Sequence, residues 1–311
     1  MPKRLALTMS LLLLTGAGCA SSSPERQEDE PAASAQTKES RQTQQQRPER
    51  ATPKADWVDK RVEQSRKRLN ETKAGGLVWK SIEAHGGLKR WFANGPVSFR
   101  YTYSPVGERT GRDTYQTIDT WSARARHQLA DDQSKEYGWD GEVAWKKPAD
   151  WKPPYNVRFW ALTPYYFMGM PFVLADPGVN LTLEEPDTIE GTDYKVVRVT
   201  FGEVGISPDD FYVLYIDPDT HKLAALRYIV SYPAYFPEGG HSPEKLMTYD
   251  GTQTVDGITF ADSYRFFMWD PAKKADAKVV TNAKLRDVEF RPDTLDSFFD
   301  VPEEGTSLKD Q

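Results

Sequence analysis

The thiol of Cys19 has the most distinctive position of any reactive side chain in this sequence, because it is the single cysteine among 311 residues. It lies in LLLLTGAGCASSSPE, residues 11–25, where an apolar run gives way to small and then to polar residues. A cysteine without a partner forms no disulfide within the chain, so core packing must stabilise the folded part. The chemistry of this thiol therefore depends on the segment around it.

The residues before Cys19 have the layout of a secretory signal. Lys3 and Arg4 form a short basic start, Leu5 to Thr15 is apolar, and Gly-Ala-Gly follows. With Ala-Ser-Ser-Ser behind it, the cysteine resembles the lipobox of bacterial lipoproteins. The resemblance implies a signal peptide at residues 1–18 and acylation of Cys19 by chains such as palmitate, after which Cys19 is the mature N-terminus.

The same segment indicates how the chain meets a membrane. The apolar run is shorter than the roughly 20 residues that cross a hydrocarbon core, so we expect export without a transmembrane helix. Ala20 stands where an Asp would retain a bacterial lipoprotein in the inner membrane, which implies an outer-membrane lipoprotein facing the periplasm or the outside. The alternative is an ordinary cleaved signal in which Cys19 has no role.

Asp209 and Asp210 are the best candidates for acid–base chemistry or for holding a cation, since they are adjacent carboxylates in GISPDDFY. Neighbouring residues on a strand point to opposite faces, and Ser-Pro-Asp-Asp is typical of a turn. We therefore interpret the pair as part of a turn before the strand FYVLYI.

Histidines and common catalytic motifs give no further candidate. His85 follows the helical pattern of GLVWKSIEAHGG and is interpreted as a helix-end residue that satisfies terminal carbonyls, while His127, His221 and His241 are scattered. No Gly-x-Ser-x-Gly, His-Glu-x-x-His or phosphate-binding glycine-rich motif occurs in the sequence. The sequence predicts no catalytic residue, metal site or cofactor. A hydrolase with an unfamiliar site remains the enzymatic alternative.

Charge and composition restrict the classes of binding partner and indicate where the parts of the chain begin and end. Without Lys3 and Arg4 the mature chain has 38 basic and 46 acidic side chains, a formal charge of −8, which argues against a nucleic-acid partner. Its membrane contact is expected through the N-terminal lipid anchor. Residues 19–53 are polar and predict a flexible tether.

Three further parts follow the tether. Residues 54–75 combine dense charge with few apolar side chains, which predicts a marginal, solvated helix; a helix lying on lipid headgroups is the alternative. Aromatic residues concentrate beyond residue 75, so residues 76–305 are expected to form one domain, and residues 306–311 a tail.

Alternation of apolar residues with period two predicts that this domain is mainly β. In VSFRYTYS, residues 97–104, Val97, Phe99 and Tyr101 share one face. Asp140-Gly141 and Asp256-Gly257 lie between such runs and predict hairpins, and IDPDTHK predicts a slightly longer turn. The strand KLAALRYIVSYP is apolar on both faces, so either helices cover the sheet or it curls around an apolar interior.

The segment RFWALTPYYFMGMPFVLADPG, residues 158–178, follows neither the helical nor the strand period, and its three prolines prevent a long helix. We expect a short helical or looped cover over the concave face of the sheet. Its methionines suit an adaptable binding wall, whereas ordinary core packing is the alternative.

Three motifs in the domain resemble the LolA/LolB superfamily of lipoprotein carriers. They are YGWDGEVAWKKP, FYVLYIDPDTHKLAALRYIVS and the C-terminal LDSFFDVPEEG. The matching positions are turn residues, among them Asp140, Gly141, Asp217 and Pro218. The chain looks closer still to an uncharacterised group of bacterial exported proteins of the same layout.

The resemblance implies an α+β fold in which a curled antiparallel sheet forms an unclosed β-barrel, covered by helices and holding an apolar cavity for acyl chains. By position, Arg100 is nearest to the arginine that holds the closed lid in carriers that receive lipoproteins. No protein partner is implied beyond a lipid or an acylated lipoprotein.

These observations lead to one expected function. We expect a concave apolar face that binds a hydrophobic ligand, a lipid or an acylated protein. The alternative is a non-catalytic envelope module whose aromatics fill its own core. The candidate wall residues are Phe99, Tyr101, Trp121, Trp139, Trp145, Phe167, Met168, Met170 and Phe172.

Overall fold

The computed structural model describes residues 49–107, 110–202, 207, 209–272 and 274–308. The expected signal peptide, the acylated Cys19 and most of the tether, up to residue 48, lie outside the described residues. No helix among the described residues has the length and apolar character needed to cross a membrane.

Three helices precede the sheet: α1 (Ala55–Leu69), α2 (Lys73–Ala84) and α3 (Leu88–Ala93). The hydroxyl of Thr72 accepts the N–H of Gly75 at 3.0 Å and caps the start of α2. At the other end, Nδ1 of His85 donates to the carbonyl of Ser81 at 2.8 Å, because a carbonyl oxygen can only accept. The interpretation of His85 as a helix-end residue is thus confirmed.

In the described part of the chain, fifteen strands follow α3, interrupted by helix α4 (Val157–Met168) and the short helices η1 (Phe172–Ala175) and η2 (Asp296–Phe299). The strands are β1 (Val97–Pro105), β2 (Arg112–Ile118), β3 (Ala125–Leu129), β4 (Glu136–Trp139), β5 (Ala144–Lys147), β6 (Val179–Ile189), β7 (Thr192–Phe201), β8 (Phe211–Ile216), β9 (Leu223–Tyr228), β10 (Lys245–Asp250), β11 (Gln253–Val255), β12 (Ile258–Phe260), β13 (Ser263–Asp270), β14 (Lys274–Phe290) and β15 (Thr306–Leu308).

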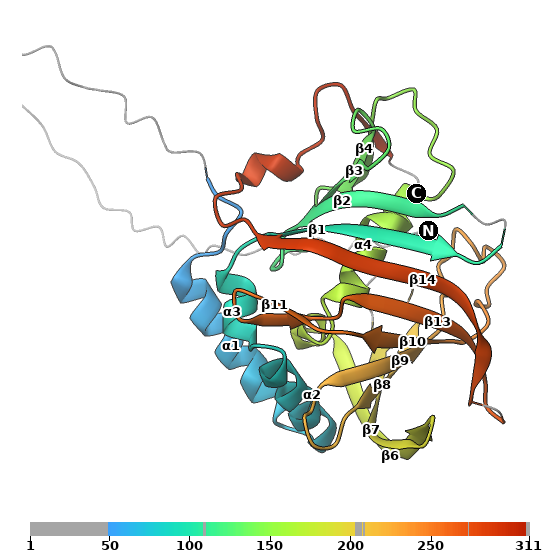
Figure 1. Cartoon of the computed structure of the whole chain (residues 1–311). Helices are drawn as coiled ribbons and strands as arrows, with labels where there is room; N and C mark the ends of the chain where they lie inside the picture. The colour runs from blue at the N-terminus through green and yellow to red at the C-terminus, as the bar shows by residue number, and fades with distance from the viewer. Residues whose placement is uncertain (1–48, 108–109, 203–206, 208, 273, 309–311) are drawn as a thin grey trace, which may run out of the picture. The chain divides into compact units, whose positions relative to one another are not determined.

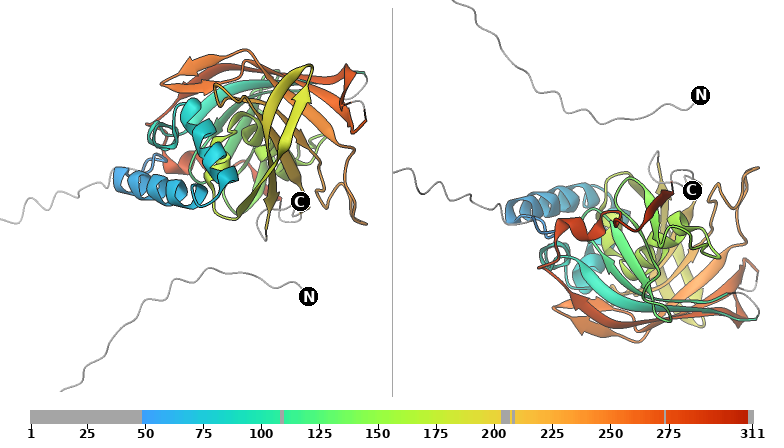
Figure 2. Two further views of the ribbon diagram at one scale, coloured as in Figure 1. Left: turned by 90° about the horizontal axis from the view of Figure 1, so that it is seen from below. Right: turned by 90° about the horizontal axis from the view of Figure 1, so that it is seen from above.

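Thirteen of the strands form one antiparallel sheet, in the order β15-β5-β4-β3-β2-β1-β14-β13-β10-β9-β8-β7-β6. The two end strands, β15 and β6, do not pair with each other within the described part of the chain, so the sheet curls without closing (Figure 1). Helices α1 to α4 lie on its concave side (Figure 2). The expected fold, an unclosed antiparallel barrel covered by helices, is confirmed.

The expected hairpins are present at both Asp-Gly pairs. Asp140 follows β4, and its carboxylate accepts the N–H of Glu142 at 2.8 Å and of Val143 at 2.7 Å, which closes the turn into β5. Between β11 and β12, Asp256 and Gly257 have φ of 48° and 78°, as a two-residue hairpin turn requires.

The inner face of the sheet and the helices enclose one continuous apolar core. Val97, Phe99 and Tyr101 of β1 are at most 2% exposed and pack in it with residues of α2, α3 and η1. Alternate residues of β7 to β10 and β13, such as Val196 and Trp269, form a smaller cluster. This explains why several strands are apolar on both faces.

The segments before and after the domain are more closely packed than the sequence indicates. Helix α1 buries Val58, Ser65 and Leu69, and the Ser65 hydroxyl donates to the carbonyl of Ala175 in η1 at 3.1 Å. Residues 49–53, assigned to the tether, lie against the domain: Ala51 is 0% exposed and its N–H donates to the carbonyl of Thr294 at 2.9 Å.

The end of the chain differs from the expected tail in the same way. Residues 306–308 form β15, which pairs antiparallel with β5 and has Leu308 opposite Ala144. The backbone of β5 offers an unpaired edge at this point, and pairing satisfies the polar groups of both strands.

Alanine at Gly138 is expected to lower the free energy of unfolding by about 1–3 kcal/mol. A Cβ at this position in β4 would overlap the Ala125 carbonyl oxygen and lie 2.6 Å from ring carbons of Trp145, so the strands must separate. Urea denaturation measures the loss. The matched control is Gly76→Ala in α2, where the nearest atom is 3.6 Å away, and equal stability of the two variants would contradict the packing described.

Candidate ligand-binding pocket

Helix α4 is the central element of the site, and its start is determined locally. The Asn156 side chain accepts the N–H of Phe159 at 2.8 Å, which caps the first turn. The helix then continues to Met168 with Pro164 inside it. The cover expected over residues 158–178 is therefore confirmed as α4 followed by η1.

Three side chains attach α4 to distant parts of the domain through backbone carbonyls. Nε2 of His127 on β3 donates to the carbonyl of Ala161 at 2.8 Å. The Tyr249 hydroxyl of β10 donates to the carbonyl of Phe167 at 3.1 Å. From α4 itself, the Tyr165 hydroxyl donates to the carbonyl of Thr120 at 3.2 Å. These bonds hold α4 at a fixed position across the concave face of the sheet.

A cavity of about 140 Å³ lies between α4 and the part of the sheet formed by β7, β8 and β9. The helix contributes Arg158, Phe159, Leu162, Thr163, Tyr166 and Phe167. The strands and the segments next to them contribute Phe201, Ser207, Asp210, Tyr212, Tyr228, Ile229 and Val230. We call this cavity, with these lining residues, the α4 pocket.

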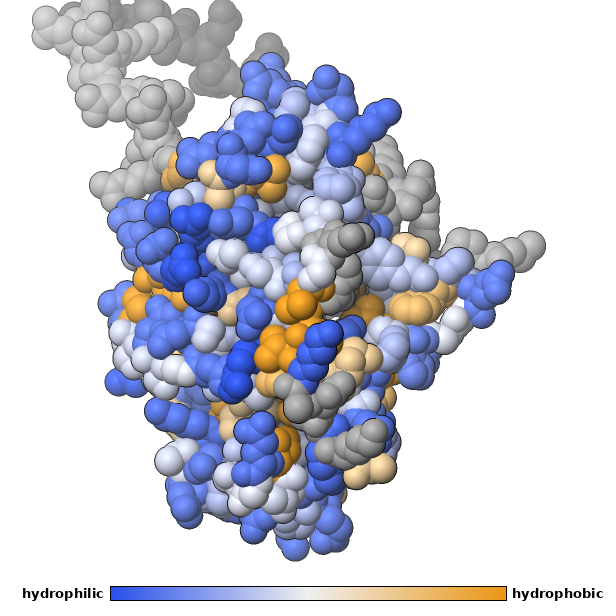
Figure 3. Space-filling model, turned by 45° about the vertical axis from the view of Figure 1, so that its right-hand side comes forward, coloured by the Kyte–Doolittle hydropathy of each residue, from blue (hydrophilic) through white to orange (hydrophobic). Residues whose placement is uncertain are grey.

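The walls of the α4 pocket are made largely of rings that contact one another. The centroids of Phe167 and Tyr228 are 5.4 Å apart, and those of Phe201 and Tyr212 are 5.7 Å apart. Tyr166 also lines the pocket and is 36% exposed, so the cavity reaches the surface. Figure 3 shows one face of the molecule, on which hydrophobic residues gather near the centre, bordered by hydrophilic ones.

The volume limits what fits into the pocket in this conformation. A cavity of about 150 Å³ lined by apolar residues is enough for a benzene ring, whereas pockets for drug-sized ligands have about 300–1,000 Å³. The α4 pocket, at about 140 Å³, takes one ring or a short alkyl segment. A longer chain must extend out of the pocket or displace flexible side chains.

The α4 pocket contains one cation and one carboxylate among its described lining residues. The carboxylate of Asp210 accepts the N–H of Ser231 at 2.5 Å and the hydroxyl of the same residue at 2.8 Å. Burial raises the pKa of Asp210, and the two bonds from Ser231 oppose that rise. The guanidinium of Arg158 lies 3.6 Å from the centre of the Trp139 ring, over its face.

The structure places the turn at Asp209-Asp210 as expected. The N–H of Asp210 donates to the carbonyl of Ser207 at 3.0 Å, and β8 begins at the next residue. Among the described residues, no group of three or more His, Cys, Asp or Glu side chains is arranged to hold a metal ion.

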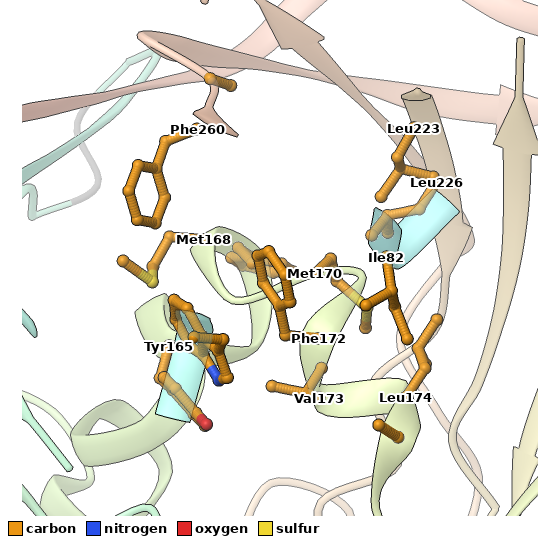
Figure 4. Close-up of a cluster of buried hydrophobic side chains, with 14 of the residues drawn as sticks. Ile82, Tyr165, Met168, Met170, Phe172, Val173, Leu174, Leu223, Leu226 and Phe260 are labelled. Carbon is orange, nitrogen blue, oxygen red and sulfur yellow. The ribbon is translucent and has the colours of Figure 1, made fainter. Parts of the chain in front are cut away.

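Of the nine side chains expected to line the cavity, Phe167 lines the α4 pocket and Trp139 lies against its arginine. Five others are 2% or 3% exposed and lie in the central core: Phe99, Tyr101, Met168, Met170 and Phe172. Figure 4 shows Met168 and Met170 on either side of Phe172. The ligand-binding role of these residues stays a prediction.

The remaining two predicted wall residues lie elsewhere. Trp145 of β5 is fully buried, with the Arg126 guanidinium 5.6 Å from the centre of its ring. Trp121 is 36% exposed, and its indole N–H donates to the carbonyl of Ala51 at 2.7 Å. It therefore fixes the N-terminal segment to the domain.

Arg100 does not contact the cover. It pairs with Asp113 of β2 at 2.6 Å, on the face of β1 opposite Phe99 and Tyr101. Alternation along the strand accounts for this, since residues of even number here point away from the interior.

Arg158, Tyr212 and Val230 are lining residues that sequence reasoning did not select. Arg158 is the first residue of the apolar segment that was expected to cover the sheet. A single cation in an apolar segment is a feature of the sequence that could have marked it as a candidate binding residue. The contribution of Tyr212 and Val230 depends on where α4 crosses the sheet, which long-range contacts decide.

One family matches part of the chain, residues 158–240, and is described as a family of unknown function, DUF6503. These residues include every described residue that lines the α4 pocket. No curated protein matches the chain in sequence.

Several solved structures match this one, including the following two. A LolA superfamily protein from Nitrosomonas europaea has a TM-score of 0.48 and 12% identity, covering 73% of this chain and 97% of its own. A DUF1329 family protein from Desulfovibrio piger has a TM-score of 0.47 and 11% identity, with the same coverage of 73% and 97%.

Proposed function

We propose that this protein is an outer-membrane lipoprotein, anchored through an acylated Cys19, whose domain binds the apolar part of a lipid or of an acylated protein in the α4 pocket. The observation that supports this most strongly is the pocket itself, a cavity of about 140 Å³ with mainly aromatic and aliphatic walls that reaches the surface at Tyr166. The layout of residues 1–19 supports the anchor and the cell envelope as the location.

Apolar burial provides the binding energy in this proposal. A segment of about five methylene groups fills a cavity of this size and contributes about 4 kcal/mol, at roughly 0.8 kcal/mol for each group. This corresponds to a Kd of about 1 mM, so tighter binding requires that more of the chain be buried.

Met168 and Met170 provide a route to that larger burial. They follow the pocket residue Phe167 along the chain and lie in the core beside Phe172 (Figure 4). Methionine side chains change rotamer at low cost and adapt to irregular space. We therefore keep the predicted wall residues in the central core as the second part of the binding surface, occupied when a longer acyl chain displaces them.

Tryptophan at Val230 is expected to weaken binding of N-phenyl-1-naphthylamine by about tenfold or more, because the added ring fills most of the cavity. This neutral apolar fluorophore can place its phenyl ring in the pocket while its naphthyl group extends out of it. Val230 is only partly buried, so the domain should still fold. Fluorescence titration of the full chain carrying Cys19→Ser, which avoids detergent, measures this Kd.

The matched control is Val106→Trp, a residue 47% exposed and outside the pocket lining, which should bind the fluorophore as the parent does. Native mass spectrometry and solvent extraction of the same protein identify any lipid that copurifies. Absence of fluorophore binding together with absence of extractable lipid would refute the proposed function.

The second candidate is an envelope interaction module without a ligand. The observation that favours it is the filled interior, where Trp91 of α3 stacks on Phe172 of η1 with centroids 4.6 Å apart. The titration separates the two candidates, since only the ligand-binding function requires that the fluorophore bind.

A further inference from the structure

The α4 pocket has a charged group that an apolar ligand alone would not require. Arg158 is the only cation among its described lining residues, and its guanidinium is half-buried over the Trp139 ring at 3.6 Å. A ring contact satisfies one face of the planar group but leaves its N–H donors at the edges free.

Arg158 has no anionic partner among the described residues, unlike Arg100 and Arg124. Arg100 pairs with Asp113 at 2.6 Å, and Arg124 pairs with Asp119 at 2.9 Å. Within the described residues, Arg158 forms no ion pair within 4.0 Å and donates no hydrogen bond. Asp210, the carboxylate of the pocket, accepts the N–H and the hydroxyl of Ser231 through Oδ1 and forms no ion pair with Arg158 within 4.0 Å.

Burial lowers the pKa of the Arg158 guanidinium below its ordinary value, although the group stays charged at neutral pH. A half-buried cation without a partner is unfavourable, and a bound anion would remove that cost. Tyr166, which lines the same pocket and is 36% exposed, offers a hydroxyl donor beside it.

We propose that the α4 pocket selects amphiphiles with an anionic head, a carboxylate or a phosphate, which the Arg158 guanidinium binds while the alkyl chain lies between α4 and β7 to β9. The fork of N–H donors fits both head groups in a bidentate way. This inference rests on the proposed function, and it adds the class of ligand: fatty acids or anionic lipids in place of neutral ones.

Displacement of bound N-phenyl-1-naphthylamine by ten-carbon competitors tests the inference on the full chain carrying Cys19→Ser. The competitors are 1-decanol, decanoate, decyl phosphate and decyltrimethylammonium. A charged hydrogen bond in a partly buried site changes the affinity by about 10- to 100-fold. Decanoate or decyl phosphate should therefore displace the fluorophore at a concentration about 10- to 100-fold lower than decanol does. The order between these two anions distinguishes a fatty acid from a phospholipid as the source of the head group.

Arg158→Gln should abolish this preference while the affinity for decanol stays within about threefold. Arg198→Gln is the matched control, because Arg198 also lies over a ring, that of Phe211 at 4.1 Å, but does not line the pocket. Arg158→Lys should keep part of the preference.

Equal displacement by decanol and decanoate, or a preference that survives Arg158→Gln, would overturn the inference and leave the proposed function intact. Failure of the fluorophore and of every competitor to bind, together with absence of extractable lipid, would instead overturn the proposed function. The melting temperature of each variant shows whether its fold is retained.

Discussion

Replacing Trp91 with alanine is expected to lower the free energy of unfolding by about 3–5 kcal/mol, the range for removing a large buried aromatic side chain. Trp91 is 1% exposed. Its ring is nearly parallel to that of Phe172, at 6° and 4.6 Å, and lies 6.3 Å from that of Tyr165. It therefore joins α3, η1 and α4, and its loss would leave a cavity in the centre of the core.

Guanidinium denaturation followed by far-ultraviolet circular dichroism measures this change. Trp121→Ala is the control, because Trp121 is 36% exposed: its ring contacts that of Trp57 at 5.2 Å and its indole N–H donates to the Ala51 carbonyl at 2.7 Å. The control should lower the free energy of unfolding by about 1–2 kcal/mol. A loss for Trp91→Ala no larger than that of the control would show that the interior is not packed as described.

Local patterns were sufficient to predict most of the fold. Alternation in VSFRYTYS assigned Phe99 and Tyr101 to the inner face, where both are 2% exposed. Both Asp-Gly pairs lie in hairpins: Asp256 and Gly257 both have positive φ, whereas Asp140 closes a four-residue loop through its carboxylate and only Gly141 has positive φ there. These features depend on neighbours in sequence, so one chain is enough to recognise them.

The path of the terminal segments could not be predicted in this way. Helix α1 is densely charged, yet it packs on the domain. Its Ser65 hydroxyl donates to the carbonyl of Ala175 at 3.1 Å, and its Arg68 guanidinium donates to the carbonyl of Asp176 at 3.0 Å. Strand β15 depends on an edge of the sheet that lies far away in sequence. In both cases the partner is a backbone group. The composition of a segment does not indicate which distant backbone groups are free to pair with it.

The site was harder to predict than the fold for a physical reason. Strand alternation says which side chains face inward, but not which of them line a cavity and which fill the core. That division is decided by α4, whose position depends on His127, Tyr249 and Thr120, all more than 30 residues from the atoms they contact. Phe167 was selected because it belongs to the cover, whereas Tyr212 of β8 requires knowledge of the crossing point.

The stability of the domain is expected to fall by about 3 kcal/mol between pH 6.5 and pH 4 because of His127 alone, at about 1.4 kcal/mol for each pKa unit. Burial lowers the pKa of His127 from 6.5 to about 4, opposed by its bond to the Ala161 carbonyl. The ring is 0% exposed and stacks on Tyr137 at 4.4 Å. Its Nε2 carries the hydrogen donated to Ala161, and Nδ1 has no acceptor among the described residues. A proton added at Nδ1 would therefore be a buried, unpaired charge.

The two pKa values of His127 determine that acid lowers the stability. The unfolded chain protonates His127 near pH 6.5, and the folded chain near pH 4. Between these values mainly the unfolded state binds the proton. The contribution of His127 to the free energy of unfolding is therefore fully present above pH 6.5 and is lost as the pH falls to about 4. Urea denaturation at pH 7.5, 5.5 and 4.5 measures the decrease.

His127→Gln should reduce this pH dependence, because its amide can donate to the Ala161 carbonyl and does not titrate. Burial lowers the pKa of His85 as well, and that contribution is common to both proteins, so the difference between the two curves isolates His127. Parallel curves for the parent and the variant would mean that the imidazole is hydrated in the folded state. The bond that fixes α4 over the pocket would then be exposed to solvent, and acid would not act on the cover through this residue.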